Sequence, residues 1–344
     1  MIIPVSLGEA SYDIVLLRGA LNNLNEYLDL ERRVLVITDT GVPSEYLRTV
    51  LSQCKQGFSV SIEEGEESKS LDNYKTLLSI LIRKGFTRTD CIIALGGGVC
   101  GDLAGFVAST YMRGVEFGFI TTTLLGVVDA SVGGKNGVNI GGYKNMVGTF
   151  SQPQFVICDV SLLHTLPDRE FRAGLAEMIK TAILGDAELF EILERSTFEA
   201  LREDKSLLTD VVTRCVRVKA SVVAQDEREA GCRRILNLGH TVAHAIEKES
   251  SNYSHGEAVA IGIYYMTRKA LEHNLISDVD AKRIFALIER YGFDVELPIE
   301  RKAMLKAIGG DKKRRGDALH LILPTAIGAV EDREVALDGL ENFL

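Results

Sequence analysis

The sequence contains no tryptophan, and it has only six prolines and six cysteines among its 344 residues. The cysteines form no C-x-x-C pair and follow no regular spacing, which argues against a disulfide framework and favours reduced thiols. No apolar run approaches the roughly 20 residues that a membrane-spanning helix requires. The N-terminus also lacks the basic region that opens a signal peptide. We therefore expect a cytoplasmic protein that does not associate with membranes.

An excess of basic residues is missing as well. The chain carries 48 acidic and 39 basic residues, for a formal net charge of -9. Nucleic-acid-binding proteins usually present a basic face, so nucleic acid is not an expected partner. A small anionic substrate remains compatible with this balance, because the charges that line a cleft set the field inside it.

Strand-like and helix-like patterns alternate in the first half of the chain. Short apolar runs that read as buried strands occupy residues 32–41, 90–96, 117–126 and 154–159. This alternation predicts an α/β domain with a Rossmann-like parallel sheet over residues 1–165. Long helical patterns and one β-hairpin near the end follow, so we expect a mostly α-helical domain over residues 166–344.

Several motifs after the predicted strands could bind a nucleotide. Gly96, Gly98 and Gly101 have G-x-G-x-x-G spacing between a strand and a helix, where backbone N–H groups can bind phosphate, although a tight turn alone would also need glycine. Asp39 ends another strand and could bind ribose hydroxyls, or simply form a turn or helix cap. Glu66 and Lys69, taken by themselves, indicate a solvated charged loop.

Residues 124–153 are rich in glycine yet carry four polar side chains of interest: Asp129, Lys135, Lys144 and Asn145. Glycine lets the backbone approach a ligand closely. Two lysines in such a segment favour a phosphate or carboxylate ligand. A flexible surface loop is the competing interpretation.

Three of the six histidines fall between residues 236 and 260. His240 and His244 have the i, i+4 spacing of two metal ligands on one helix face, and His255 begins the next predicted helix. The glutamate of an H-E-x-x-H metalloprotease motif is absent, because Thr241 occupies its position. A metal site is therefore expected, and the candidates for its carboxylate ligand are Glu177, Glu247 and Glu257.

Taken together, several blocks of the chain resemble the 3-dehydroquinate synthase family. They occur in the family's order: GGGVCGDLAGFVASTYMRG, TTLLGVVDASVGGKNGVN, KNMVGTF, GLAEMIK, DEREAGCRRILNLGHTVAHAIE and HGEAVAIG. The resemblance implies a carbon-oxygen lyase of the shikimate pathway that converts 3-deoxy-D-arabino-heptulosonate 7-phosphate into 3-dehydroquinate and phosphate. It also implies NAD in catalytic amount, one zinc or cobalt ion, and a homodimer.

The same resemblance implies roles for individual residues. The metal ligands would be Glu177, His240 and His255. The NAD-binding positions would be Asp39, Glu66, Lys69, Gly97, Gly98, Asp102, Thr122, Thr123 and Lys144. Substrate would contact Arg113, Lys135, Lys144, Asn145, Lys219, Arg233, Asn237, His244 and Lys313. The catalytic group would comprise Lys135, Lys180, His244, Asp129 and Asn145.

The chain departs from the family pattern at two positions. Ala243 stands where the family usually has glycine, and the second departure keeps related functions open. Asn139 stands where the family usually has aspartate, and asparagine there is more typical of other sugar-phosphate cyclases such as 2-deoxy-scyllo-inosose synthase. The substitution removes one negative charge near an anionic ligand while keeping the ability to hydrogen-bond. Two further candidate functions are an NAD- and metal-dependent glycerol-type dehydrogenase and a non-catalytic NAD-binding protein.

Overall fold

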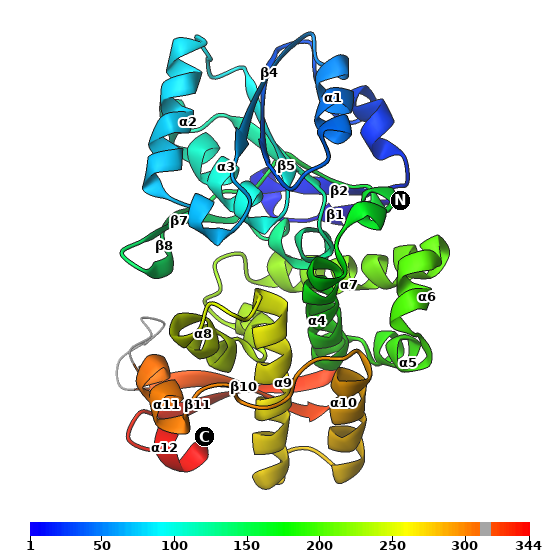
Figure 1. Ribbon diagram of the computed structural model, residues 1–344, viewed down its shortest axis with the longest axis vertical. Coiled ribbons are helices and arrows are strands. Elements are labelled where there is room, and N and C mark those ends of the chain that lie inside the picture. The colour runs from blue at the N-terminus through cyan, green and yellow to red at the C-terminus, as the bar shows by residue number, and fades with distance from the viewer. Residues whose placement is uncertain (310–317) are drawn as a thin grey trace. The chain divides into compact units, whose positions relative to one another are not determined.

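The computed structural model describes residues 1–309 and 318–344 (Figure 1). These residues form two compact units, Met1–Pro167 and Asp168–Leu344. A parallel-dominated sheet with helices makes up the first unit, and helices dominate the second, so the predicted fold class is confirmed. No described helix is both long enough and apolar enough to span a bilayer.

A seven-stranded sheet forms the centre of the first unit, with the order β1-β2-β9-β6-β5-β3-β4. Only the pair β1 and β2 is antiparallel; the remaining neighbours are parallel. The strands are β1 (Ile2–Val5), β2 (Tyr12–Leu16), β3 (Arg33–Asp39), β4 (Gln56–Ile62), β5 (Cys91–Gly96), β6 (Glu116–Thr121) and β9 (Phe155–Cys158).

Burial explains why these short apolar runs are strands. Every residue of β5 is buried, as expected for a parallel strand that is covered on both faces. The helices of this unit are α1 (Ser44–Gln53), α2 (Leu71–Arg83) and α3 (Gly98–Thr110). Its 3-10 helices are η1 (Gly8–Ala10), η2 (Ala20–Glu26), η3 (Glu66–Ser68), η4 (Tyr111–Arg113) and η6 (Val160–Thr165).

The strand order brings three predicted nucleotide-binding segments to one edge of the sheet. β5 lies between β3 and β6, and all three strands are parallel. Their carboxyl ends therefore lie side by side and carry Asp39, Gly96 and Thr121. Ligands of open α/β sheets bind at this edge, so the topology supports the prediction from the motifs.

The glycine-rich segment 124–153 is not a structureless loop. Residues Gly126–Ala130 form one π-helical turn, η5, and a hairpin of β7 (Lys135–Ile140) and β8 (Tyr143–Phe150) follows. Gly141 and Gly142 close the hairpin with φ of 57° and 77°, a backbone conformation that favours glycine. The interpretation as a flexible loop therefore describes this segment poorly.

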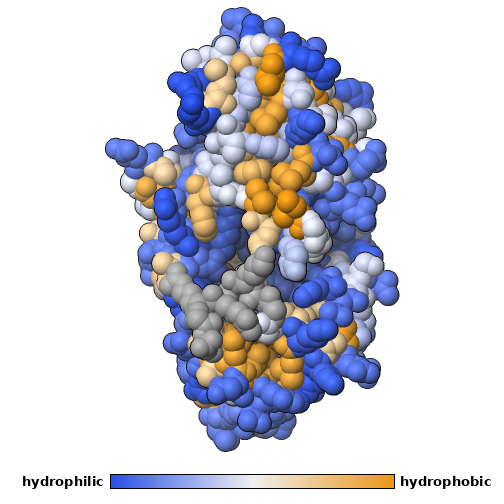
Figure 2. All heavy atoms as spheres, turned by 90° about the vertical axis from the view of Figure 1, so that its left-hand side faces the viewer, coloured by the Kyte–Doolittle hydropathy of each residue, from blue (hydrophilic) through white to orange (hydrophobic). Residues whose placement is uncertain are grey.

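The surface of the hairpin is partly apolar. Ile140, Tyr143, Met146 and Phe150 are among the exposed large hydrophobic residues of the described chain. The face drawn in Figure 2 is mostly hydrophilic, with hydrophobic residues gathered in separate patches. Scattered apolar surface of this kind is ordinary for folded proteins.

Helices account for most of the second unit: α4 (Asp168–Gly185), α5 (Ala187–Arg195), α6 (Phe198–Glu203), α7 (Lys205–Gln225), α8 (His240–Glu249), α9 (His255–Glu272), α10 (Asp278–Arg290), α11 (Arg301–Gly309) and α12 (Leu340–Phe343). A 3-10 helix, η7 (Cys232–Asn237), precedes α8, and β10 (Ala318–Ala326) pairs with β11 (Ala329–Ala336). The helical pattern over 168–195 is interrupted at Asp186. The carboxylate of this residue caps α5 by accepting the N–H of Leu189 at 2.9 Å.

Glycines allow close packing around α9. A Cβ on Gly262 would lie 2.0 Å from the carbonyl oxygen of Gly239, and one on Gly256 would lie 2.2 Å from the Cα of Ala173. The backbone of α9 thus approaches both α4 and the start of α8 more closely than any larger residue permits. This packing brings the N-terminus of α9 beside the middle of α4.

Candidate active site

Three predicted ligands meet in the second unit. Glu177 Oε1 lies 3.6 Å from His240 Nε2 and 3.4 Å from His255 Nε2. One ligand atom from each of these residues lies within 4.8 Å of the other two. The i, i+4 pair from the sequence is therefore not the cluster, because His255 joins His240 in place of His244.

Local structure places each of the three side chains. His240 is the first residue of α8, after Gly239 in the left-handed conformation at φ 79°. His255 is the first residue of α9, whose start is set by a capping box between Ser254 and Glu257. Glu177 lies within α4 and is 1% exposed. Two helix starts and one helix middle therefore supply the cluster.

The opposite ring nitrogens of the two histidines are also engaged. His240 Nδ1 lies 3.2 Å from the carbonyl oxygen of Leu238, and His255 Nδ1 lies 3.3 Å from Glu247 Oε1. An acceptor at Nδ1 holds the proton there and leaves Nε2 as the ligand atom, which is the usual arrangement of metal-binding histidines. Both Nε2 atoms accordingly face Glu177.

The charges around His255 attract a cation. Burial by itself would lower the pKa of His255, but hydrogen bonds to Glu177 and Glu247 and their negative charges raise it to about 10. A metal ion at Nε2 would be favoured by the same two carboxylates. It would displace the proton, because only a neutral imidazole can bind a metal.

The donor set fits a divalent ion of the zinc type. Both carboxylate oxygens of Glu177 are buried: Oε1 faces the two imidazoles, and Oε2 forms an ion pair with Lys180. A buried carboxylate that faces two imidazoles is a suitable ligand, since zinc and cobalt accept nitrogen and oxygen donors. Three protein ligands leave coordination positions for a substrate.

The structure gives the three candidate carboxylates different environments. Glu177 faces both imidazoles. Glu247 lies on the far side of His255 from Glu177. Glu257 caps the backbone of α9 and pairs with Arg169 at 3.0 Å. His244 packs edge-on against His240, with ring centroids 5.7 Å apart, and is not in the cluster.

Buried cations are a second feature of this unit. Lys180, Lys219 and Arg233 are 1%, 7% and 2% exposed. Such residues are almost never buried without anionic partners. Their presence in the unit that holds the Glu-His-His cluster is consistent with an anionic substrate.

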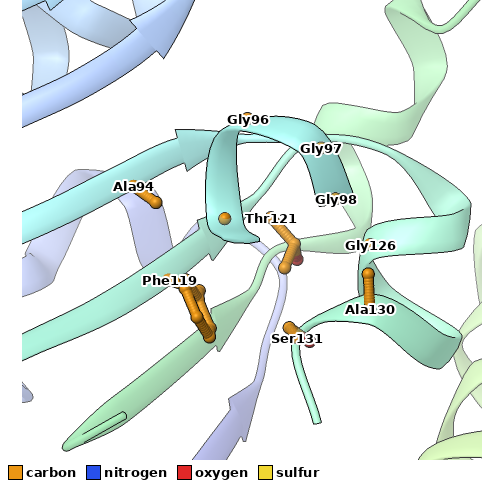
Figure 3. A pocket seen from close by; sticks show the side chains of 10 residues that line it. Ala94, Gly96, Gly97, Gly98, Phe119, Thr121, Gly126, Ala130 and Ser131 are labelled. Atoms are coloured by element: carbon orange, nitrogen blue, oxygen red, sulfur yellow. The ribbon is translucent and has the colours of Figure 1, made fainter. Parts of the chain in front are cut away.

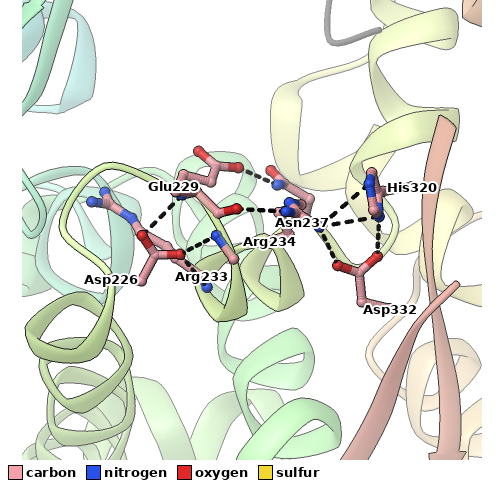
Figure 4. A network of polar contacts seen from close by, with 9 residues as sticks. Asp226, Glu229, Arg233, Arg234, Asn237, His320 and Asp332 are labelled. Carbon is pink, nitrogen blue, oxygen red and sulfur yellow. Dashed lines mark hydrogen bonds and ion pairs between the residues drawn. The ribbon is translucent and has the colours of Figure 1, made fainter. Parts of the chain in front are cut away.

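The segment before α8 is organised by two acidic residues to which the sequence analysis assigned no role (Figure 4). Asp226 accepts the backbone N–H groups of Ala230, Gly231 and Arg233 at 2.9, 2.7 and 3.1 Å. Glu229 has a left-handed backbone, φ 58°, and accepts a hydrogen bond from the predicted substrate residue Asn237. In the sequence, the local sign of this loop is that Asp226 is followed five residues later by its partner Gly231.

The glycine turn of the first unit is tightly packed (Figure 3). It belongs to a pocket that Gly96, Gly97, Gly98, Phe119, Thr121, Gly126, Ala130 and Ser131 help to line. A Cβ on Gly97 would lie 2.9 Å from Thr123 Cγ2, and one on Gly98 would lie 3.1 Å from Ala130 Cβ. Glycine therefore leaves the backbone at the N-terminus of α3 accessible, as phosphate binding requires.

Asp39 lies against the same turn. A Cβ on Gly96 would lie 2.9 Å from Asp39 Oδ2, while Asp39 Oδ1 accepts the N–H of Gly41 at 3.0 Å. Burial raises the pKa of Asp39 above its ordinary value, and the hydrogen bond from Gly41 partly opposes this. The residue thus has a turn role and also a position suited to a ribose hydroxyl. Thr122, whose N–H donates to Gly96 O at 3.0 Å, is buried beside it.

The environment of Lys69 differs from the solvated charged loop that the sequence indicated. Lys69 is only 4% exposed, and its Nζ lies 2.6 Å from Asp102 Oδ2 and 3.8 Å from Glu66 Oε1. The interpretation as a solvated charged loop is therefore wrong for Lys69. Periodicity did not reveal this, because the partner Asp102 lies on α3, far along the chain.

Other predicted substrate residues lie on the surface of the first unit. Lys135, Lys144 and Asn145 of the hairpin are exposed, as is Arg113, which has φ 65°. Asp129 is half-buried in the π-helical turn, and Thr123 accepts the N–H of Gly126 at 3.0 Å. Lys313 lies outside the described residues.

Two solved sugar-phosphate cyclases share this fold over nearly the whole chain, and the structure is similar to that class of enzyme. A 2-deoxy-scyllo-inosose synthase, in complex with carbaglucose-6-phosphate, NAD+ and Co2+, is 26% identical with a TM-score of 0.89 over 99% of this chain and 98% of that one. The 2-epi-5-epi-valiolone synthase of Streptomyces hygroscopicus subsp. jinggangensis 5008, with NAD+ and Zn2+ bound, is 29% identical with a TM-score of 0.90 over 98% and 97%.

Sequence comparison narrows the class to one family. Residues 59–173 match the family model described as 3-dehydroquinate synthase N-terminal, and residues 174–314 match 3-dehydroquinate synthase C-terminal. The 3-dehydroquinate synthase of Desulforamulus reducens is 45% identical over 96% of this chain and 95% of its own length. The chain belongs to the 3-dehydroquinate synthase family, and the predicted resemblance and enzyme class are confirmed.

Proposed function

We propose that this chain converts 3-deoxy-D-arabino-heptulosonate 7-phosphate into 3-dehydroquinate and phosphate, with catalytic NAD and a divalent metal held by Glu177, His240 and His255. The observation that carries the assignment of the metal ligands is the convergence of both Nε2 atoms on the buried Glu177 carboxylate. Family membership carries the reaction.

Zinc or cobalt is the proposed ion, since the two related cyclase structures hold Co2+ and Zn2+. Such an ion supplies a Lewis acid that polarises an oxygen of the substrate. The protein's part is to hold the ligand atoms in place. Leu238 and Glu247 fix the two imidazoles through Nδ1, and the helix packing around Gly256 and Gly262 keeps the starts of α8 and α9 near Glu177.

NAD is proposed to bind at the carboxyl edge of the parallel sheet. It supplies a hydride acceptor that gives the hydride back within the same turnover, so only a catalytic amount is needed. Backbone N–H groups at Gly97 and Gly98 would bind its phosphates at the start of α3. Asp39 would accept hydrogen bonds from a ribose, and the ion pair between the buried Lys69 and Asp102 would shape the adjoining wall.

The cationic residues suit a substrate that bears both a carboxylate and a phosphate. Lys180, Lys219 and Arg233 are buried in the unit that holds the metal cluster, and their positive charges would attract the anionic groups of such a substrate. His244 of the same unit would add to this positive field. The proton that is removed lies on the carbon next to the one that carries the phosphate. The phosphate of the substrate can itself accept this proton, so no side chain is assigned as the base.

A related cyclase activity is the second candidate, and Asn139 is the observation that favours it. The inosose-forming reaction starts from glucose 6-phosphate, which has no carboxylate and would leave part of this cationic set without a ligand. Purified protein with NAD and zinc should be given three substrates in competition: the heptulosonate phosphate, glucose 6-phosphate and sedoheptulose 7-phosphate. Phosphate release and NMR of the ring product identify the preferred one. Faster turnover of either of the latter two would replace the proposed substrate.

We also propose a cytoplasmic homodimer. The dimer is proposed from the family resemblance. The cytoplasmic location is proposed from the composition of the chain. Light scattering coupled to gel filtration measures the mass in solution. A value near the 37.7 kDa of one chain would exclude the dimer.

A further inference from the structure

Asn139, the last residue but one of β7, joins two segments of the first unit. Its Nδ2 donates to Glu66 Oε1 at 2.8 Å, and its Oδ1 accepts the backbone N–H of Asn145 at 2.9 Å. Its backbone N–H also donates to the carbonyl oxygen of Lys69 at 2.8 Å. One side chain therefore touches the segment that holds Glu66 and the far strand of the hairpin.

These two partners fix the orientation of the Asn139 carboxamide. A backbone N–H requires an acceptor, and a carboxylate requires a donor, so the oxygen must face Asn145 and the NH2 group must face Glu66. An aspartate of the same size could accept from Asn145 but could not donate to Glu66. Once ionised, it would instead place a second negative charge at hydrogen-bond distance from the first.

The contacts continue beyond Glu66 toward the glycine turn. Glu66 Oε1 lies 3.8 Å from the Nζ of the buried Lys69, which is 2.6 Å from Asp102 Oδ2. Asp102 lies on α3, which begins at Gly98. A continuous series of polar contacts thus links Asn145, which has a left-handed backbone at φ 54°, with the first turns of the helix at the nucleotide edge.

We propose that Asn139 is a positioning residue whose neutral amide sets both the NAD-binding carboxylate Glu66 and the substrate-binding residue Asn145. This inference rests on the proposed function, which assigns Glu66 to NAD and Asn145 to the substrate. Because the Asn139 amide contacts both residues, disturbing it should move Glu66 and Asn145 together. Substrate binding should therefore weaken along with NAD binding.

The test is a double-mutant cycle in the zinc-loaded enzyme with Asn139→Asp, Glu66→Gln and the double variant. NAD affinity is measured by titration calorimetry, without substrate. Asn139→Asp should weaken NAD binding about tenfold when residue 66 is glutamate and less than about twofold when it is glutamine, because only the first pair repels. The KM for the heptulosonate phosphate should rise in parallel, through Asn145.

The pH dependence separates repulsion from simple misfolding. In Asn139→Asp, the two carboxylates share a proton more readily as the pH falls, so NAD affinity should recover between pH 8 and about pH 5.5. Ile140→Asp, which adds the same charge at the next, exposed position, is the matched control and should leave NAD affinity within about twofold of wild type.

The outcomes distinguish this inference from the proposed function. If the wild-type protein fails to bind NAD, the proposed function is wrong. If the wild type binds NAD and Asn139→Asp binds it equally well, or loses affinity equally in both backgrounds at every pH, the role of Asn139 is refuted while the function stands.

Discussion

Glu247 contacts the Nδ1 atom of His255 at 3.3 Å, on the side of the ring opposite the Nε2 atom that faces Glu177. The Glu247 side chain is only 7% exposed. A carboxylate in this position orients the imidazole and raises its basicity. The histidine cluster therefore depends on a residue outside the proposed ligand set.

Replacing Glu247 should weaken the metal site without removing a ligand. We expect Glu247→Ala to lower zinc affinity by about 10- to 100-fold, because His255 loses its orienting acceptor. Competition with a chromophoric chelator measures the affinity, and the visible spectrum of the cobalt form reports the ligand geometry. Glu257→Gln is the matched control. Its amide oxygen can still accept the Ser254 N–H, and only the exposed ion pair with Arg169 is lost, so the free energy of unfolding should fall by less than about 1 kcal/mol while metal affinity stays unchanged. Equal zinc affinity in Glu247→Ala and wild type would contradict this role.

Removal of the metal tests the ligand set directly. Chelation should abolish activity, and added zinc or cobalt should restore it. Glu177→Ala, His240→Ala and His255→Ala should each lose bound metal, as measured by atomic emission of the dialysed protein. His244→Ala should keep it, since its ring lies outside the cluster. Full metal occupancy in all three ligand variants would show that the assignment is wrong.

The redox cofactor should be regenerated within each turnover. With the heptulosonate phosphate as substrate, absorbance at 340 nm should stay level while phosphate is released, and NAD should be required only in catalytic amount. A dehydrogenase would instead accumulate one NADH for each substrate consumed. That result would replace the cyclase with a dehydrogenase mechanism on the same fold.

The close approach of α9 to α4 should be sensitive to a single methyl group. In Gly256→Ala the new Cβ would lie 2.2 Å from Ala173 Cα, a distance that backbone atoms must relieve by moving apart. We expect a loss of about 1–3 kcal/mol in the free energy of unfolding, with weaker zinc binding because His255 shifts with its helix. Urea denaturation of the metal-free and zinc forms measures both effects. Gly309→Ala, which has open space around it, is the control and should change neither.

The cysteines should differ widely in reactivity. Burial raises the pKa of the Cys91 and Cys158 thiols to about 12, so almost none of either is thiolate at pH 8. Cys232 is exposed, so one thiol should react rapidly with Ellman's reagent in the native state. The reactivity of Cys91 and Cys158 should rise only when the protein unfolds, because both thiols are buried. Cys232→Ser should remove the fast phase, and a fast phase that persists in it would contradict this assignment.

Local patterns were sufficient for much of the fold. The strand, glycine turn and helix over residues 90–112 follow from apolar runs and glycine spacing, and the starts of α8 and α9 agree closely with the helices expected from residues 240 and 255. Periodicity and capping act between residues a few positions apart, so one sequence contains enough information to predict them. The family was equally accessible, because its blocks are contiguous stretches of chain.

The distinction among Glu177, Glu247 and Glu257 required the tertiary structure. All three lie on helices. The capping box that Glu257 forms with Ser254 is a local signal, but nothing local separates Glu177 as a candidate ligand from Glu247 as an orienting acceptor. Their roles follow from how closely α9 packs on α4 and α8, which Gly256 and Gly262 permit. The tertiary structure was also needed to find the burial of Lys69 beside Asp102 and the contact of Asn139 with Glu66. Each joins segments far apart in the chain, and their proximity depends on the packing of the whole unit, which no short stretch of sequence encodes.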